Sequence, residues 1–353
     1  MFCSKTVFRC FKTLERLGDR ITGAAGPFFA GLAVILISAG TICFFDVVMP
    51  SLPYRWLSGP ICALIAFNLL MHYYLVVTTS PGFVDAPPPV AGRGFMWATP
   101  RNALTERPLT EGVRWSNEFN ITKAEATKCR KCGQQKPEVY NALTMFPRLM
   151  STWKSERSHH CRVCNRCVLK YDHHCPVRIN QCVGLYNERH FVLFMAYLCI
   201  STFCFCILGY PQFFDALGLT FKRDPWPHHV PVLLYIIEFI LSGVLCFAVG
   251  IMLMFHLWTI SQGETSVESQ DNEFYGRIAK NRGEAFVNSY DLGKIRNLQL
   301  FFNIGRGGYP FYTLLFPFRI LPYTDGRSWA RREGLTRHRG IRRGEELTDE
   351  EDP

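Results

Sequence analysis

The chain has 353 residues, of which 48% are hydrophobic and 19% are charged, and this charged share is below the roughly 25% of an average soluble domain. Its 39 lysines and arginines exceed its 29 acidic residues, yet its mean hydropathy is only +0.04. Such an average combines very apolar stretches with basic ones, a pattern typical of proteins with several membrane spans. The composition excludes a disordered chain, a fibrous repeat and a secreted disulfide scaffold.

The first 27 residues form a basic, amphipathic segment. They lack the continuous apolar core and the small-residue cleavage site of a signal peptide. We therefore interpret residues 1–27 as a cytosolic N-terminal segment. Its basic residues are Lys5, Arg9, Lys12, Arg16 and Arg20.

Four apolar stretches follow, each reaching the roughly 20 residues that a helix needs to cross the hydrocarbon of a bilayer. They lie at about 27–49, 58–79, 191–214 and 230–260. Buried helices of a soluble protein are the alternative, but here the apolar stretches alternate with basic loops. We therefore predict transmembrane helices 1 and 2 within residues 28–79, and helices 3 and 4 within residues 191–260.

The basic residues predict the orientation of these spans. Seventeen of the 39 lie between residues 80 and 190, and 14 lie after residue 260. Because basic loops stay on the cytoplasmic side, both termini and the 80–190 loop are expected in the cytosol. A lipid bilayer is the expected partner, and nucleic acid is not, because the basic residues are divided among segments separated by apolar stretches.

The parts outside the spans differ in composition. Residues 80–127 are rich in proline and glycine, which is typical of an irregular linker, whereas residues 128–190 contain a dense set of cysteines and histidines. Residues 261–330 predict a cytosolic C-terminal segment with an amphipathic helix and apolar loops against the bilayer. Residues 331–353 are charged and predict a disordered tail.

Seven of the 15 cysteines lie between residues 129 and 182, together with four histidines. In the reducing cytosol this pattern favours metal ligation or thiol chemistry over disulfides. Two closed tetrahedral zinc sites need eight ligands, so three of the eleven candidates are left over, and spacing alone does not identify them. The candidates are Cys129, Cys132, His159, His160, Cys161, Cys164, Cys167, His173, His174, Cys175 and Cys182.

The sequence Asp172-His173-x-Cys175 has a second possible meaning. A carboxylate, an imidazole and a thiol are the orienting group, base and nucleophile of a cysteine acyl enzyme. The spacing is equally compatible with Cys175 as another zinc ligand.

The motif Asp172-His173-His174-Cys175-Pro176, in a loop between spans two and three of four, resembles the DHHC-type protein S-acyltransferases, or palmitoyltransferases. The resemblance extends to Thr265-Ser266-Val267-Glu268, which is similar to the family's Thr-Thr-x-Glu motif with serine in place of the second threonine. Other matching positions are 157–161, 165–168, Cys182-Val183-Gly184, Asn187, 288–291, Asn297 and Phe301.

This resemblance implies an all-α membrane fold of four transmembrane helices, with a cytosolic zinc-binding cysteine-rich domain between spans two and three. It implies that Cys175 is the nucleophile, His173 its base and Asp172 the residue that orients the base. Two structural zinc ions are implied, one held by Cys129, Cys132, His160 and Cys167, and the other by Cys161, Cys164, His174 and Cys182.

The implied activity is protein-cysteine S-palmitoyl transfer. Palmitoyl-CoA or another long-chain acyl-CoA would donate the acyl group, and accessible cysteines of membrane-associated proteins would accept it. Membranes of the Golgi or endoplasmic reticulum are the expected location. No residue that binds the CoA phosphates can be named from the sequence.

Two departures from the family pattern bear on activity. Residues 138–156 form an insert where the family has about one residue, and Val177-Arg178 replaces a tryptophan, so that Cys182 lies seven positions after Cys175 instead of six. The alternative function is therefore an inactive relative or a membrane-anchored zinc module that recruits partners without catalysis. A membrane ubiquitin ligase with a RING-like domain would not need the Asp-His-His-Cys-Pro motif.

Overall fold

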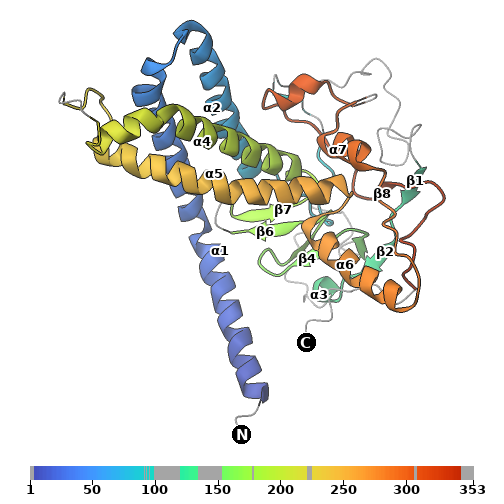
Figure 1. The fold of residues 1–353 in the computed structure, drawn as a ribbon. Coiled ribbons are helices and arrows are strands. Elements are labelled where there is room, and N and C mark those ends of the chain that lie inside the picture. The colour runs from blue at the N-terminus through green and yellow to red at the C-terminus, as the bar shows by residue number, and fades with distance from the viewer. Residues whose placement is uncertain are drawn as a thin grey trace. The chain divides into compact units, whose positions relative to one another are not determined.

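A computed structural model of the chain describes residues 4–90, 92, 94, 96–98, 120–133, 153–176, 179–220, 225–305 and 308–342 (Figure 1). The chain forms two compact units. Unit 1 comprises Met1–Thr78, Cys175–Asn180 and His190–Phe255, and unit 2 comprises Thr79–His174, Gln181–Arg189 and His256–Pro353.

Unit 1 is helical, as the four apolar stretches predict. Its helices are α1 (Ser4–Cys43), α2 (Arg55–Thr78), most of α4 (Glu188–Ala216) and most of α5 (Val232–Ser261). The four segments long and apolar enough to cross a membrane are Ala25–Ser51, Arg55–Thr78, Glu188–Ala216 and Val232–Ser261, with mean hydropathies of 1.9 to 2.5. The prediction of four spans, two before and two after the cysteine-rich region, is therefore confirmed for the described residues.

The first helix does not start at the boundary that composition suggested. Helix α1 runs unbroken from the basic segment through Pro27 into the apolar stretch, and Figure 1 draws it as one long helix. It then ends in a π-helical turn, Phe44–Val48, and a 3₁₀ turn, Met49–Ser51.

Asp46, in the π-helical turn, fixes the short connection between α4 and α5. Its Oδ2 accepts a hydrogen bond of 2.9 Å from the Val230 amide, and its Oδ1 lies 3.0 Å from Nδ1 of His229. Nδ1 of His228 lies 3.1 Å from the Asp46 carbonyl oxygen. The two histidines are thus polar partners of Asp46.

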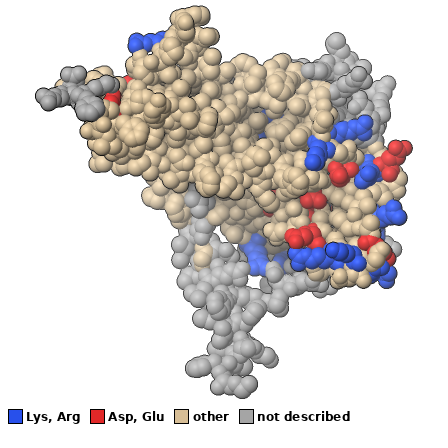
Figure 2. Space-filling view, viewed as in Figure 1, with Lys and Arg blue, Asp and Glu red and all other residues tan. Residues whose placement is uncertain are grey.

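The outer surface of the helices suits a lipid environment. Large apolar side chains such as Phe247, Trp258 and Met254 of α5 are at least 60% exposed. On the face drawn in Figure 2, the surface over α4 and α5 carries almost no charged side chains. A buried cluster inside unit 1 contains Cys43, Val47, Val48, Phe205, Val230 and Tyr235.

Unit 2 is built from short antiparallel strand pairs. Strands β4 (His159–Cys161) and β5 (Arg166–Val168) form one hairpin, and β6 (His173–Cys175) pairs with β7 (Gln181–Val183). Strand β2 (Ala126–Lys128) precedes α3 (Arg130–Gly133) and pairs with β3 (Trp153–Ser155), while β1 (Asn120–Lys123) pairs with β8 (Ser328–Arg331).

Two helices and a small core complete unit 2. Helix α6 (Ser266–Asn281) begins with a capping box between Thr265 and Glu268, and α7 (Lys294–Phe302) follows it. Phe311–Leu314 form a 3₁₀ turn. The amide of Asn297 donates 2.9 Å to the Ser261 carbonyl, which ties α7 to the end of α5. The core contains Leu169, Leu185, Tyr290, Leu300, Tyr323, Trp329 and Ala330.

The expectation that disorder begins at residue 331 is wrong for the described part of the tail. Arg331 is only 2% exposed, pairs with Glu156 and lies 4.9 Å from the centre of the Tyr290 ring. Nδ1 of His338 accepts a 3.0 Å hydrogen bond from the Ser289 amide, and burial lowers the pKa of His338 to about 4. The charged composition predicted disorder, but Arg331 is buried and ion-paired within the fold, which composition alone cannot indicate.

We expect Arg331→Ala to open the β1–β8 pair, because a removed partner leaves Glu156 without its buried cation. Loss of about 3 kcal/mol is typical of a broken buried pair. Hydrogen–deuterium exchange of the β1 and β8 amides should then be roughly 100-fold faster.

Arg332→Ala is the matched control, since the Arg332 side chain is exposed. Equal exchange in both variants would contradict a structural role for Arg331.

Candidate active site and metal centres

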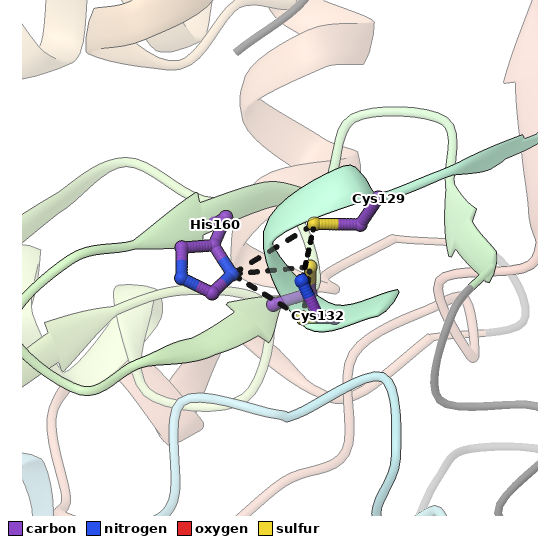
Figure 3. Close-up of side chains that lie close together, drawn as sticks. Cys129, Cys132 and His160 are labelled. Carbon is purple, nitrogen blue, oxygen red and sulfur yellow. Dashed lines mark hydrogen bonds between the residues drawn. The ribbon is translucent and has the colours of Figure 1, made fainter. Parts of the chain in front are cut away.

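The first ligand cluster joins a loop after β2 to the β4–β5 hairpin. Cys129 and Cys132 flank the start of α3, and His160 of β4 lies beside them (Figure 3). Cys167 of β5 is the partner of His160 in the β4–β5 register. Nδ1 of His160 lies 3.3 Å from Sγ of Cys132, 3.8 Å from Sγ of Cys129 and 3.9 Å from Sγ of Cys167. The Cys132 amide also donates to Sγ of Cys129 at 3.4 Å, which closes the knuckle between the two cysteines.

The second cluster has the same ligand types and shares only β4 with the first, since it consists of Cys161 of β4, Cys164 of the β4–β5 turn, His174 of β6 and Cys182 of β7. Sγ of Cys164 lies 3.4 Å from Sγ of Cys182 and 3.5 Å from Nδ1 of His174. Nδ1 of His174 lies 3.4 Å from Sγ of Cys182 and 3.6 Å from Sγ of Cys161. Because side chains alternate along a strand, His160 of β4 joins the first cluster and its neighbour Cys161 joins the second.

Both clusters fit zinc. Tetrahedral zinc with Zn–S bonds of about 2.3 Å and Zn–N bonds of about 2.0 Å holds its ligand atoms about 3.5–3.8 Å apart, close to the separations in both clusters. The sulfur atoms are too far apart for disulfides, whose S–S length is about 2.05 Å, and no disulfide joins the described cysteines. With three thiolates and one imidazole each, the clusters leave no open coordination position and are consistent with two structural zinc sites.

The two departures in the sequence leave the clusters intact. Residues 177–178 and 134–152 lie outside the described residues, but Cys182 stands within its cluster despite the extra residue before it. The end of the insert is part of the fold, because Trp153–Ser155 form β3 and Glu156 pairs with Arg331.

Asp172 lies at the centre of a hydrogen-bonded network beside the second cluster. Nδ1 of His173 lies 2.6 Å from its Oδ2, and the Ser266 amide donates 2.7 Å to its Oδ1. The Ser266 hydroxyl donates 2.9 Å to the Asp172 carbonyl oxygen. Burial by itself would raise the pKa of Asp172, but the hydrogen bond and positive charge of His173 lower it to about 2. Asp172 is therefore a carboxylate at neutral pH.

Ser266 is held in place by the start of α6. The Thr265 hydroxyl accepts from the Glu268 amide, and the Glu268 carboxylate accepts from the Thr265 amide, as in a capping box. Both oxygens of Glu268 also accept 2.6 Å hydrogen bonds from Arg157, whose guanidinium lies between the Tyr290 and Trp329 rings. The motif Thr265–Glu268 thus both caps α6 and places Ser266 against Asp172. Although burial raises it, Arg157 holds the pKa of Glu268 below its usual value.

The structure adds one residue that the sequence reading missed. His256, near the end of α5, places Nδ1 3.8 Å from Oδ2 of Asp172, and its ring centre is 5.9 Å from that of His173. These three residues are close enough to suggest a metal site, but 2.6 Å between His173 and Asp172 is too short for two ligands of one ion. The available signal was a histidine within an otherwise apolar span.

Two histidines and one cysteine of the eleven candidate ligands lie outside both clusters. Neither cluster includes His159, His173 or Cys175. His159 lies beside the Tyr171 ring, with ring centres 6.1 Å apart, and His173 contacts Asp172. Cys175, the predicted nucleophile, is the last residue of β6 and is 8% exposed.

The chain is similar to known palmitoyltransferases. A family model described as DHHC palmitoyltransferase matches residues 145–273. Palmitoyltransferase ZDHHC16A of Danio rerio is 25% identical over 88% of this chain and 79% of its own length, and Palmitoyltransferase ZDHHC16 of Mus musculus is 27% identical over 93% and 80%. A protein described as probable protein S-acyltransferase 15 of Arabidopsis thaliana is 31% identical over 54% of this chain and 65% of its own length.

We expect two zinc ions per chain in the purified protein, measured by inductively coupled plasma mass spectrometry, and one in the Cys182→Ser variant. Losing one of four ligands should release the ion of the second cluster while the first keeps its own. Cys199→Ser, which changes a cysteine of α4 outside both clusters, should retain two. Two zinc ions in Cys182→Ser would mean that Cys182 is not a ligand.

Proposed function

The chain belongs to the DHHC palmitoyltransferase family, and from this we propose that it is a protein-cysteine S-acyltransferase that uses Cys175 as its nucleophile. The observation that carries the proposal is the ionised Asp172, which is hydrogen-bonded to His173 and Ser266. Asp172 lies three residues before Cys175, a cysteine outside both ligand clusters. Strand alternation adds support. In β6, His174 turns to the second cluster, so His173 and Cys175 share the other side of the strand.

The first half-reaction loads the enzyme. His173 takes the thiol proton of Cys175, and the thiolate attacks the thioester carbonyl of a long-chain acyl-CoA such as palmitoyl-CoA. The carbon–sulfur bond to CoA breaks, the CoA thiolate takes the proton from His173, and an acyl thioester forms on Cys175.

The second half-reaction transfers the acyl chain to a protein. His173 removes the proton of a cysteine thiol on a membrane-associated substrate, and that thiolate attacks the Cys175 thioester. The acyl chain moves to the substrate, and the departing Cys175 thiolate recovers the proton from His173. Both steps exchange one thioester for another, so no oxidant or metal-bound reactant is needed.

Asp172 orients and charges the base. Its carboxylate accepts from Nδ1 of His173, which leaves Nε2 to exchange protons with thiols and stabilises the imidazolium once it forms. His256 is a positioning residue that acts through the same carboxylate. The two zinc ions are structural: when bound, they cross-link the short strands and fix the chain on either side of Asp172.

The membrane spans supply the place for the acyl chain. A pocket between α1, α2, α4 and α5 in unit 1 is lined mainly by apolar side chains. Each buried methylene group is worth roughly 0.8 kcal/mol, which favours holding the chain there while the polar CoA stays outside the bilayer. We assign both termini and the cysteine-rich region to the cytosol from the distribution of basic residues, and the protein to Golgi or endoplasmic reticulum membranes from its family.

We expect Cys175→Ser to abolish hydroxylamine-sensitive labelling by an alkyne analogue of palmitoyl-CoA, because serine has no thiol that can form the acyl thioester. Zinc content and membrane association should be unchanged. Cys199→Ser is the control and should label like the wild-type protein. Unchanged labelling of Cys175→Ser at another cysteine would contradict the assignment, and a wild-type protein that binds two zinc ions but never labels would support the non-enzymatic zinc module.

We expect Asp172→Asn to slow labelling of Cys175 by about 10²- to 10⁴-fold, since the base loses its orienting charge. The pKa of Asp172, about 2, lies below its usual value of 3.8. The stabilisation that the carboxylate provides is therefore complete above roughly pH 4 and is lost as the pH falls toward 2.

Labelling rates measured from pH 5 to 9 should accordingly show no titration of Asp172. Asp85→Asn, which removes an exposed carboxylate paired with Arg166, is the control. An Asp172→Asn variant within about threefold of the wild-type rate throughout that range would exclude the proposed role.

A further inference from the structure

The pocket in unit 1 is not uniformly apolar. Most of its wall is hydrocarbon, including Leu36, Phe45, Ile65, Leu198 and Leu245. One wall, however, contains the carboxyl group of Glu238, the seventh residue of α5. An ionisable side chain within a membrane span is costly, and such residues usually line a ligand site.

Glu238 is a largely buried residue whose side chain lines the pocket. The residue is 3% exposed, and it has no hydrogen bond or ion pair with any residue that the structure describes. The carboxyl lies against Gly40 of α1, where an added Cβ would come within 3.3 Å of Oε2. The glycine therefore provides the space that the carboxyl occupies beside the pocket.

A second polar group lines the same pocket. The Ser201 hydroxyl of α4 is buried and has no hydrogen-bond partner among the described residues. Two other hydroxyls of the lining are satisfied within their own helices, since Thr41 donates 2.7 Å to the Ile37 carbonyl and Thr202 donates 2.7 Å to the Leu198 carbonyl. Ser242 of α5, four residues after Glu238, also lines the pocket, so the pocket offers one carboxyl and the hydroxyls of Ser201 and Ser242 to whatever fills it.

The pocket lies where the distal end of an acyl chain attached to Cys175 would be, so Glu238 and Ser201 would meet that end of the chain. Tyr73 of α2 is near enough to Cys175 to interact with it electrostatically, while the pocket contacts α2 between Cys62 and Leu69. These positions are 4 to 11 residues from Tyr73, or roughly 6 to 16 Å along the helix axis. A chain anchored at Cys175 would therefore reach the pocket with its distal part.

We propose that this pocket selects a long acyl chain that carries a hydroxyl group near its distal end, with Glu238 and Ser201 as the specificity-determining residues. A plain hydrocarbon end would leave both polar groups buried and unpaired, which is unfavourable. A hydroxyl can donate to the Glu238 carboxyl and accept from Ser201, and it costs far less than a charged group to place among membrane helices. The inference rests on the proposed acyl transfer at Cys175 and specifies its donor.

The test compares two donors on the full-length protein in lipid nanodiscs. Initial rates of Cys175 acylation by 16-hydroxyhexadecanoyl-CoA and by hexadecanoyl-CoA are measured by intact-protein mass spectrometry. The ratio of the hydroxylated to the plain donor should fall about three- to tenfold in Glu238→Leu, as expected for one lost hydrogen bond, and less in Ser201→Ala. Glu238→Gln keeps a hydrogen-bonding amide and should stay within about twofold of the wild-type ratio.

Ile237→Leu is the matched control, because Ile237 is the neighbouring residue of α5, is 51% exposed and does not line the pocket. An unchanged ratio in Glu238→Leu, with Cys175 acylated by both donors, would overturn the inference and leave the acyltransferase intact.

Absence of any acyl group on Cys175 would instead refute the proposed function. Thermal stabilisation of Cys175→Ser by each acyl-CoA then tests separately whether the pocket prefers the hydroxylated chain. Greater stabilisation by the hydroxylated donor, lost in the Glu238→Leu double variant, would support the selection, and equal stabilisation would overturn it.

Discussion

Two ligand clusters that hold short strands together, and that share strand β4, are the constraint on which unit 2 depends. Its strands are only three or four residues long, and pairs of that size are marginal in water. Each hairpin strand carries ligands for the clusters, and adjacent residues such as His160 and Cys161 serve different ones. Two zinc ions would therefore cross-link these short strands, with β4 joined to both ions, so that metal binding supplies folding free energy that a small apolar core cannot.

This arrangement makes the position of Asp172 a consequence of the metal ligands around it. His174 is bound to the second cluster, and Asp172 is two residues earlier in the chain. The start of α6 then supplies the remaining restraint through Ser266. Glu268 both caps this helix and pairs with Arg157, which lies more than a hundred residues earlier in the sequence. The orientation of the predicted base, His173, therefore depends on this buried ion pair through Ser266 and Asp172.

The two departures from the family pattern show where the fold tolerates change. An excursion between ligands costs little if its ends remain fixed, since loop-closure entropy grows slowly with length. The end of the insert is fixed here by β3 and by the Glu156–Arg331 pair, which recruits the C-terminal segment to the same region. The extra residue after Pro176 is likewise compatible with Cys182 as a ligand.

The sequence by itself determined the four helices and the family, because spans longer than 20 apolar residues and the Asp-His-His-Cys-Pro motif are local signals, whereas cysteine spacing alone left the two ligand sets open. It could not reveal that Arg331 is buried, that His256 reaches Asp172, or that Glu238 and Ser201 line one pocket. Those facts depend on the proximity of residues 37 to 175 positions apart in sequence, and a charged or polar residue looks the same in sequence whether it is solvated or buried. Only the tertiary structure decided which buried polar groups have hydrogen-bond partners within the fold and which, such as the Ser201 hydroxyl, do not.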